Sequence, residues 1–285
     1  MSEAATRNEA MPRRSIQPTM LRVLAVAFTI FIIGYILVPI LVTLVMSFNQ
    51  AAMIRFPIND WSLRWYQDFF GSQQWMDALT NSIVIAIGTT IISTTAGILA
   101  AWAFERYAIP FKDFWYLLIM LPLYMPGVVL GLGVAIAFGG LQIGDYSIYG
   151  SRELVMVAHS LWAMPLVFML MEATFRTIDY RIVEASYDLG ARPARTFFEI
   201  VIPMVSTGIV SSALFAFVIS LNEFVMALFL TDRDSQTLPV LMWLSLRSAG
   251  TPRLAVASVI LALTVFACLT LIMVWYIRQL RKVAK

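Results

Sequence analysis

Four polar side chains stand inside otherwise apolar stretches of the sequence, where they could bind a solute or transfer a proton. Asn222 and Glu223 lie together in one stretch, Glu172 lies near the end of another, and His159 is the single histidine. An acid at membrane depth is costly and usually faces a cavity, a partner or the interface. Asn222 and Glu223 are therefore predicted to line a pathway suited to a cation; pairing of Glu223 with a basic group of a partner is the alternative.

His159 is predicted to be a packed, hydrogen-bonded helix residue, and Glu172 to reach the nearby surface. The sequence lacks the G-x-x-x-x-G-K-[ST] phosphate loop, H-E-x-x-H and C-x-x-C, and its single cysteine is Cys268. We find no Ser, His and Asp set that would support catalysis. The expectation is a chain that is not an enzyme and holds no metal or cofactor of its own.

Composition points to a protein embedded in a membrane. The chain has 285 residues, of which 60% are hydrophobic and 13% charged, whereas soluble domains carry about 25% charged residues. A helix needs about 20 apolar residues to cross a bilayer. Six stretches meet this length, so we predict an all-α integral membrane fold with six transmembrane helices. They cover residues 23–46, 83–104, 114–138, 154–175, 205–230 and 254–277.

The placement of basic residues predicts the orientation. Fourteen of the 20 Lys and Arg residues lie before the first span, after the sixth, and in the loops after the second and fourth. Basic residues in short loops stay on the cytoplasmic side, so both termini are predicted to be cytoplasmic in a bacterial inner membrane. The net charge of +3 reflects this signal, and nucleic acid is not expected as a partner.

The predicted organisation has four parts. Residues 1–20 form a cytoplasmic tail, 21–80 the first span with an aromatic periplasmic loop, 81–277 the main transmembrane domain, and 278–285 a second cytoplasmic tail. The aromatic loop is predicted to contain a surface helix, and residues 231–253 another short helix. Pro122, Pro126 and nearby glycines predict that the third span bends or breaks, either for packing or because it lines the route.

The loop at residues 176–203 is amphipathic. Apolar residues recur at helical spacing with charged residues on the other faces, and Gly190 and Pro193 predict a break between two short helices. The apolar residues at this spacing are Ile182, Ala185, Leu189, Phe197, Ile200 and Val201. Such a pair of helices on the cytoplasmic surface suits docking into a groove of another protein.

This loop resembles the EAA signature loop of ABC importer permeases. The family pattern is Glu-Ala-Ala, three residues, Gly, nine residues, Ile, one residue, Leu and Pro. The sequence keeps that spacing with Ser186 in place of the second Ala and Ile202 in place of Leu, and the resemblance covers residues 80–277. The matching residues are Glu184, Ala185, Ser186, Gly190, Ile200 and Pro203.

The resemblance implies a type I permease subunit, with the loop seated in an ATP-binding subunit and Glu184 held there by polar groups. It also implies a second permease subunit, forming a heterodimer, two ATP-binding subunits that carry ATP and Mg, and a periplasmic solute-binding protein. The run from Ser220 to Phe224 and the later Thr237, Leu238 and Pro239 resemble the second permease of spermidine and putrescine importers. Alternatives are an opine, aminoalkylphosphonate or ferric iron permease, or an ion-coupled transporter or channel.

Overall fold

The computed structural model describes residues 18–248 and 250–283. The predicted N-terminal tail, apart from its last three residues, and the last two residues of the C-terminal tail lie outside this part. The elements run α1 (Pro18–Met46), α2 (Arg64–Gly71), α3 (Gln73–Arg106), α4 (Lys112–Tyr124), α5 (Gly127–Phe138), β1 (Gln142–Ile143), β2 (Tyr146–Ser147), α6 (Arg152–Phe175), α7 (Tyr180–Asp188), α8 (Pro193–Thr196), η1 (Phe197–Val201), α9 (Ile202–Met204), α10 (Ser206–Asn222), α11 (Val225–Leu230), α12 (Leu238–Ser248) and α13 (Arg253–Val283).

Within residues 18–248 and 250–283, four unbroken helices, α1, α3, α6 and α13, are long and apolar enough to cross a membrane, and two bent helix pairs raise the number to six if each pair is one span. The third predicted span is not one helix but α4 and α5, bent by 102°. Met125 has the extended backbone that a following proline imposes, so the prediction of a break is confirmed. The fifth predicted span is also divided, because α10 ends at Asn222 and α11 begins at Val225.

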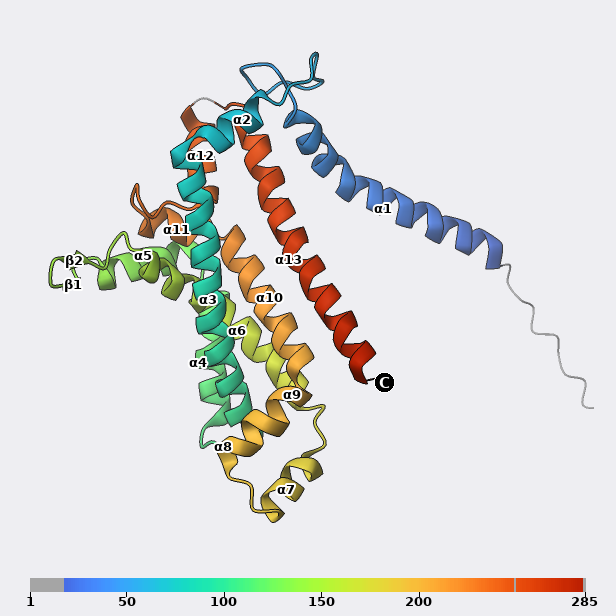
Figure 1. Cartoon of the computed structure of the whole chain (residues 1–285), viewed down its shortest axis with the longest axis vertical. Helices are drawn as coiled ribbons and strands as arrows, with labels where there is room; N and C mark the ends of the chain where they lie inside the picture. The colour runs from blue at the N-terminus through green and yellow to red at the C-terminus, as the bar shows by residue number, and fades with distance from the viewer. Residues whose placement is uncertain (1–17, 249, 284–285) are drawn as a thin grey trace, which may run out of the picture.

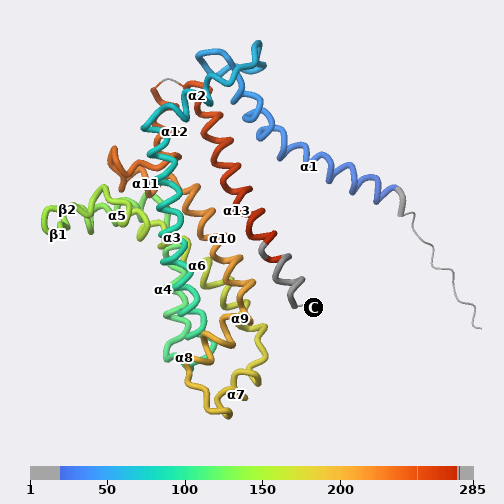
Figure 2. The backbone as a smooth tube through the Cα atoms, in the orientation of Figure 1, coloured from blue at the N-terminus to red at the C-terminus, as the bar shows by residue number. Residues whose placement is uncertain are grey.

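The structure departs from an all-helical fold at one small hairpin. The strands β1 and β2 are antiparallel, with Gln142 opposite Ser147 and Ile143 opposite Tyr146. The hairpin follows α5 and projects sideways from the bundle (Figure 2). Gly144, in the turn between the strands, has a φ of +62°, which suits a tight connection of this kind.

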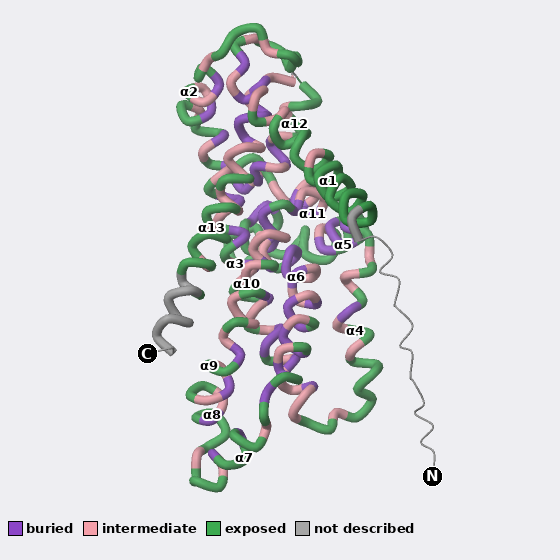
Figure 3. Tube along the Cα trace, turned by 90° about the vertical axis from the view of Figure 1, so that its right-hand side faces the viewer, coloured by how far each residue is buried: buried purple, intermediate pink, exposed green. Residues whose placement is uncertain are grey.

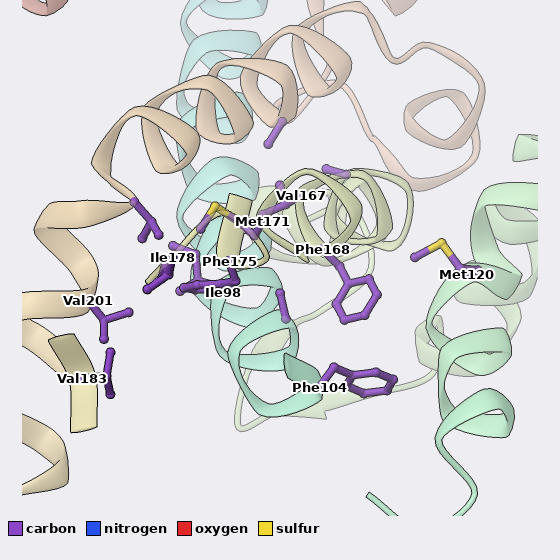
Figure 4. Close-up of a cluster of buried hydrophobic side chains, with 14 residues drawn as sticks. Ile98, Phe104, Met120, Val167, Phe168, Met171, Phe175, Ile178, Val183 and Val201 are labelled. Atoms are coloured by element: carbon purple, nitrogen blue, oxygen red, sulfur yellow. The ribbon is translucent and has the colours of Figure 1, made fainter. Parts of the chain in front are cut away.

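The core is built where α3, α6 and α10 pack together. Phe104 meets Phe168 edge to face at a ring distance of 5.1 Å, and Val167, Met171 and Phe175 of α6 are completely buried. Figure 4 shows these side chains converging from α3, α6 and the segments that follow them. Burial is concentrated along α6 and the helices around it, whereas α1 is exposed along most of its length (Figure 3).

The aromatic loop before α3 contributes a second core at the opposite end of the bundle from α7 (Figure 1). The predicted surface helix is α2, but Trp65 and Phe69 of that helix are buried, as is Trp75, because they pack against α12 and α13. Only part of the loop keeps the expected interfacial exposure, for example Trp61 at 68%. Arg253 of α13 pairs with Asp68 of α2, and its guanidinium lies over the Trp75 ring at 5.6 Å.

The helix that contains the second predicted span begins at Gln73, before the predicted start of that span at residue 83. Asn81 and Ser82 fasten α3 to the segment before α12. The Asn81 amide donates to the carbonyls of Asp234 and Gln236 at 2.8 and 3.0 Å, and the backbone N–H of Leu238 donates to Ser82 Oγ at 2.7 Å. These bonds satisfy backbone groups of an irregular segment that would otherwise be unpaired.

Candidate functional site

The loop with the signature residues folds into two short helices, α7 and α8, that meet at Gly190. We call residues 179–196 the elbow. Asp179 caps α7 by accepting from the N–H of Arg181 at 3.1 Å, and the Arg181 side chain lowers the pKa of the Asp179 carboxyl. Gly190 has a φ of +82°, and Pro193 occupies the first turn of α8. The predicted break between two short helices is confirmed.

The elbow is fixed to the bundle through one face of α7. Val183 is completely buried in the main core, and the hydroxyl of Ser186 bonds that of Thr196 at 2.9 Å, which ties α7 to α8. The Tyr187 ring receives the guanidinium of Arg106 at 5.9 Å. The hydroxyl that distinguishes Ser186 from the family's alanine therefore forms a bond inside the elbow.

The apolar stripe of α7 and of the residue that follows it is exposed. Ile182 is 48% exposed and Leu189 89% exposed, and Ala185 is exposed between them. The anchoring face needs only Val183 and Ser186, so the wider apolar stripe points away from the bundle. An apolar stripe on the tip of the molecule, together with exposed Glu184, is available for contact with another chain.

The downstream half of the signature lies beyond the elbow. Ile200 is half-buried in η1, next to completely buried Val201, while Pro203 is exposed in α9. These two residues shape the bent entry into α10, where Pro193–Met204 and Ser206–Asn222 meet at 76°. The signature residues thus divide between the elbow and the bend that leads into α10.

A second group of functional side chains lies within the bundle, at the break between α10 and α11. His159 Nε2 is 3.1 Å from Glu223 Oε2, and His159 Nδ1 bonds Ser220 Oγ at 2.9 Å. The Ser220 hydroxyl donates to Thr89 Oγ1 at 3.2 Å. We call Glu223, His159, Ser220 and Thr89 the polar chain; it joins α6, α10 and α3.

The geometry of Glu223 differs from what an open pathway residue would show. Its side chain is 2% exposed, and its two oxygens accept the N–H groups of Met226 and Ala227 at 2.9 and 3.1 Å. Asn222 is exposed and donates to the carbonyl of its own helix at Val218. The roles predicted for Asn222 and Glu223 toward a solute or a partner stay predictions, but within this chain the Glu223 carboxylate already has partners.

The sequence did not reveal that Ser220 and Thr89 belong with His159. The polar chain includes a Ser–His–Glu series, yet its members are at most 5% exposed, which leaves no open approach for a substrate. The prediction that His159 is packed and hydrogen-bonded is confirmed. Glu172 is predicted to reach the surface, but it is buried, at 7% exposure, and pairs at 2.6 Å with exposed Arg176 near the end of α6.

A polar cavity of about 540 Å³ opens at the end of the bundle remote from the elbow. It lies between the starts of α3 and α6 and the segment before α12. Side chains of both charge signs and several amides line it: Gln73, Gln74, Asp77, Arg152, Arg233, Asp234 and Gln236. Such a lining suits contact with a polar protein surface.

The sequence matches the family described as binding-protein-dependent transport system inner membrane component over residues 93–285. The chain belongs to this family. It is therefore a multi-pass inner-membrane permease component and not an enzyme, and the signature residues of the elbow lie inside the matched region.

Individual relatives agree with this membership. The chain is 30% identical to the putrescine transport system permease protein PotI of Escherichia coli (strain K12), with 86% of each chain covered. It is 25% identical to the spermidine/putrescine permease protein PotC of the same strain, covering 85% of this chain and 90% of that one. It is also 32% identical to the molybdenum transport system permease protein ModB of Mycobacterium bovis, over 74% of this chain and 83% of the relative.

Solved structures share the fold. A chain of a bacterial ABC transporter that imports the acidic polysaccharide alginate matches with a TM-score of 0.72 at 14% identity, covering 91% of this chain and 95% of that chain. A chain of the MetNI methionine ABC transporter matches with a TM-score of 0.55 at 17% identity, covering 75% and 100%. These likenesses establish an ABC permease fold.

Proposed function

We propose that this chain forms half of the translocation pathway of an ATP-driven importer for a small cationic solute such as putrescine or spermidine. In this proposal α4 with α5 and α10 with α11 each count as one span, which gives six spans, and both termini are cytoplasmic. A second permease subunit supplies the other half of the pathway. Two ATP-binding subunits, which carry ATP and Mg, drive it, and a periplasmic solute-binding protein delivers the solute.

The exposed apolar stripe of the elbow is the observation that carries the proposal. Leu189, at 89% exposure, Ile182 and Glu184 are all exposed on a segment that buried Val183 of α7 holds to the bundle. A rigidly supported amphipathic helix pair presented to solvent is suited to a groove on a partner. The spacing of the signature from Glu184 to Pro203 supports an ATP-binding subunit as that partner.

The outer end of the molecule supports the delivery step. The polar cavity around Arg152, Arg233 and Asp77 lies at the end opposite the elbow, where a solute-binding protein would dock. One of the structural neighbours is an alginate transporter in complex with its ligand-bound periplasmic protein. A docking surface with charges of both signs favours specificity and fast association.

Relatives named for putrescine and spermidine support a cationic substrate. The relative named for molybdenum has a similar identity to this chain, so membership alone does not select the solute. An opine, an aminoalkylphosphonate or ferric iron remains the alternative substrate within this class. An ion-coupled transporter or channel is the alternative of another class.

Reconstitution into liposomes tests the proposal. The chain, its co-encoded second permease and ATP-binding subunits, and the binding protein are expected to take up labelled putrescine only with ATP on the cytoplasmic side. Omitting the ATP-binding subunit should abolish uptake. Uptake by this chain alone, driven by an ion gradient, would refute the importer proposal, whereas ATP-dependent uptake of another solute would refute only the cationic substrate.

A further inference from the structure

Two helix breaks lie next to each other in the bundle. One separates α4 from α5 at Met125 and Pro126, and the other separates α10 from α11 at Glu223 and Phe224. The short helices that follow the breaks, α5 and α11, pack against each other (Figure 1). Their contact is close, because a Cβ on Gly131 of α5 would lie only 2.9 Å from the Cα of Met226 of α11.

The unbroken helix α6 supplies one side chain to each break. His159 Nε2 lies 3.1 Å from the Glu223 carboxylate, and Trp162 Nε1 donates to the carbonyl of Pro122 at 2.9 Å. His159 and Trp162 are three residues apart, so they share one face of α6. A single helix face thus contacts both breaks.

Glu223 is the group through which His159 reaches α11. The helix α11 has six residues, too few to be stable alone, and its first N–H groups have no partner within the helix. Glu223 satisfies two of them, those of Met226 and Ala227. His159 meets this carboxylate through the 3.1 Å ion-pair contact of its Nε2 with Glu223 Oε2. Among the described residues Nε2 has no hydrogen-bond partner that competes with this contact.

We propose that His159 is a positioning residue for the transport cycle: it holds Glu223 on the first turn of α11 and so fixes the α5–α11 pair against α6. In this role the hydrogen-bonding oxygens of Glu223 matter, and its negative charge toward a solute does not. The test by solute uptake rests on the proposed importer function, whereas the test by hydrogen exchange of the α11 amides does not.

The test uses three variants and one matched control. Glu223→Gln removes the charge and keeps one of the two acceptor oxygens, whereas Glu223→Ala removes the charge and both oxygens. His159→Phe keeps a ring but cannot bond. Ser160→Ala is the control, because the Ser160 hydroxyl is also buried in α6 but donates only to the carbonyl of Val157 in the same helix.

The first measurement is hydrogen exchange of the α11 amides in the full chain purified in lipid nanodiscs. Glu223→Ala and His159→Phe are expected to speed exchange at Met226 and Ala227 by about tenfold or more, because each removes one partner of a buried pair. Glu223→Gln is expected to give a smaller increase, because one of the two amides keeps its acceptor oxygen, and the Ser160→Ala control is expected to exchange like the unmodified chain. Unchanged exchange in His159→Phe would overturn the proposal, whether or not the importer transports putrescine.

The second measurement is putrescine taken up per ATP hydrolysed by the reconstituted importer. A purely structural role would lower the yield of assembled importer but leave this ratio unchanged, and that result would also overturn the proposal. We expect the ratio to fall about tenfold in His159→Phe and Glu223→Ala, and the double variant to be no worse than either single variant, because both substitutions remove the same contact.

Loss of uptake in Glu223→Gln as complete as in Glu223→Ala would assign Glu223 to solute binding instead. Absence of putrescine uptake by the unmodified importer would count against the proposed substrate, and the exchange measurement would still decide the role of His159.

Discussion

Replacing Leu189 with alanine is expected to weaken binding of the ATP-binding subunit without destabilising the permease. Leu189 is 89% exposed at the tip of the elbow, so almost none of its apolar surface contributes to the fold. Fully burying a leucine side chain gains about 1.5–3 kcal/mol, and alanine keeps only the first carbon of that side chain. If the elbow docks through this stripe, the substitution should cost about 1–2 kcal/mol of binding free energy, or roughly a five- to thirtyfold increase in Kd.

The assay is a titration of the purified ATP-binding subunit onto the permease pair in nanodiscs. Ile143→Ala is the matched control, since Ile143 is also a highly exposed aliphatic residue, at 71%, but lies on the hairpin away from the elbow (Figure 1). The control should bind with the Kd of the unmodified protein, and both variants should unfold at the same temperature as it does. An unchanged Kd for Leu189→Ala would refute docking through the apolar stripe.

Three further substitutions test other parts of the argument. Gly190→Ala should destabilise the elbow by about 1 kcal/mol and speed amide exchange there, because the φ of +82° is unfavourable for alanine even though its Cβ would have open space. Gly190→Asn should be tolerated better, because asparagine adopts this left-handed conformation more readily. Asn81→Ala leaves the carbonyls before α12 without their donor and should lower the free energy of unfolding by about 1–3 kcal/mol; Thr80→Ala, whose hydroxyl bonds only its own helix, is the control in thermal unfolding. Glu184→Lys should leave insertion and unfolding temperature unchanged, because the residue is exposed, yet abolish the stimulation of ATP hydrolysis by solute. Normal stimulation in that variant would contradict a coupling role for Glu184.

Local chemistry explains which features could be predicted from the sequence. The break between α4 and α5 was predictable because Pro126 restricts Met125 and removes a helix donor, and the elbow because Gly190 adopts a positive φ ahead of Pro193. Both signals lie at the break itself. The existence of each long apolar stretch was equally local, since length and hydropathy decide it.

The break between α10 and α11 has no such local signal. Neither Gly nor Pro occurs between Ser220 and Leu230, and the first N–H groups of α11 are satisfied by Glu223, whose partner His159 lies in another helix. The pattern of α7 predicts an apolar stripe but does not say whether that stripe faces the bundle or solvent. Leu189 faces outward, because Val183 and Ser186 supply the buried face of α7.

The positions of α6 and α10 connect the elbow to the polar chain. The elbow follows the C-terminal end of α6, and α10 begins shortly after the elbow ends. His159 lies about 24 Å along α6 from Phe175, and Ser220 about 21 Å along α10 from Ser206, at 1.5 Å per residue. A displacement of the elbow by an ATP-binding subunit would therefore move two stiff helices whose far ends meet at the His159–Ser220 bond.

The break beyond that bond is where such a movement can be absorbed. An unbroken helix transmits displacement along its hydrogen-bond ladder, but between α10 and α11 the ladder is replaced by the side chain of Glu223. Two arrangements of α5 and α11 can then differ by rotation at Glu223 and at Met125 without unfolding either short helix. It follows that loss of the His159 contact should leave ATP hydrolysis able to move the elbow while solute no longer follows, which is the fall in uptake per ATP expected for His159→Phe.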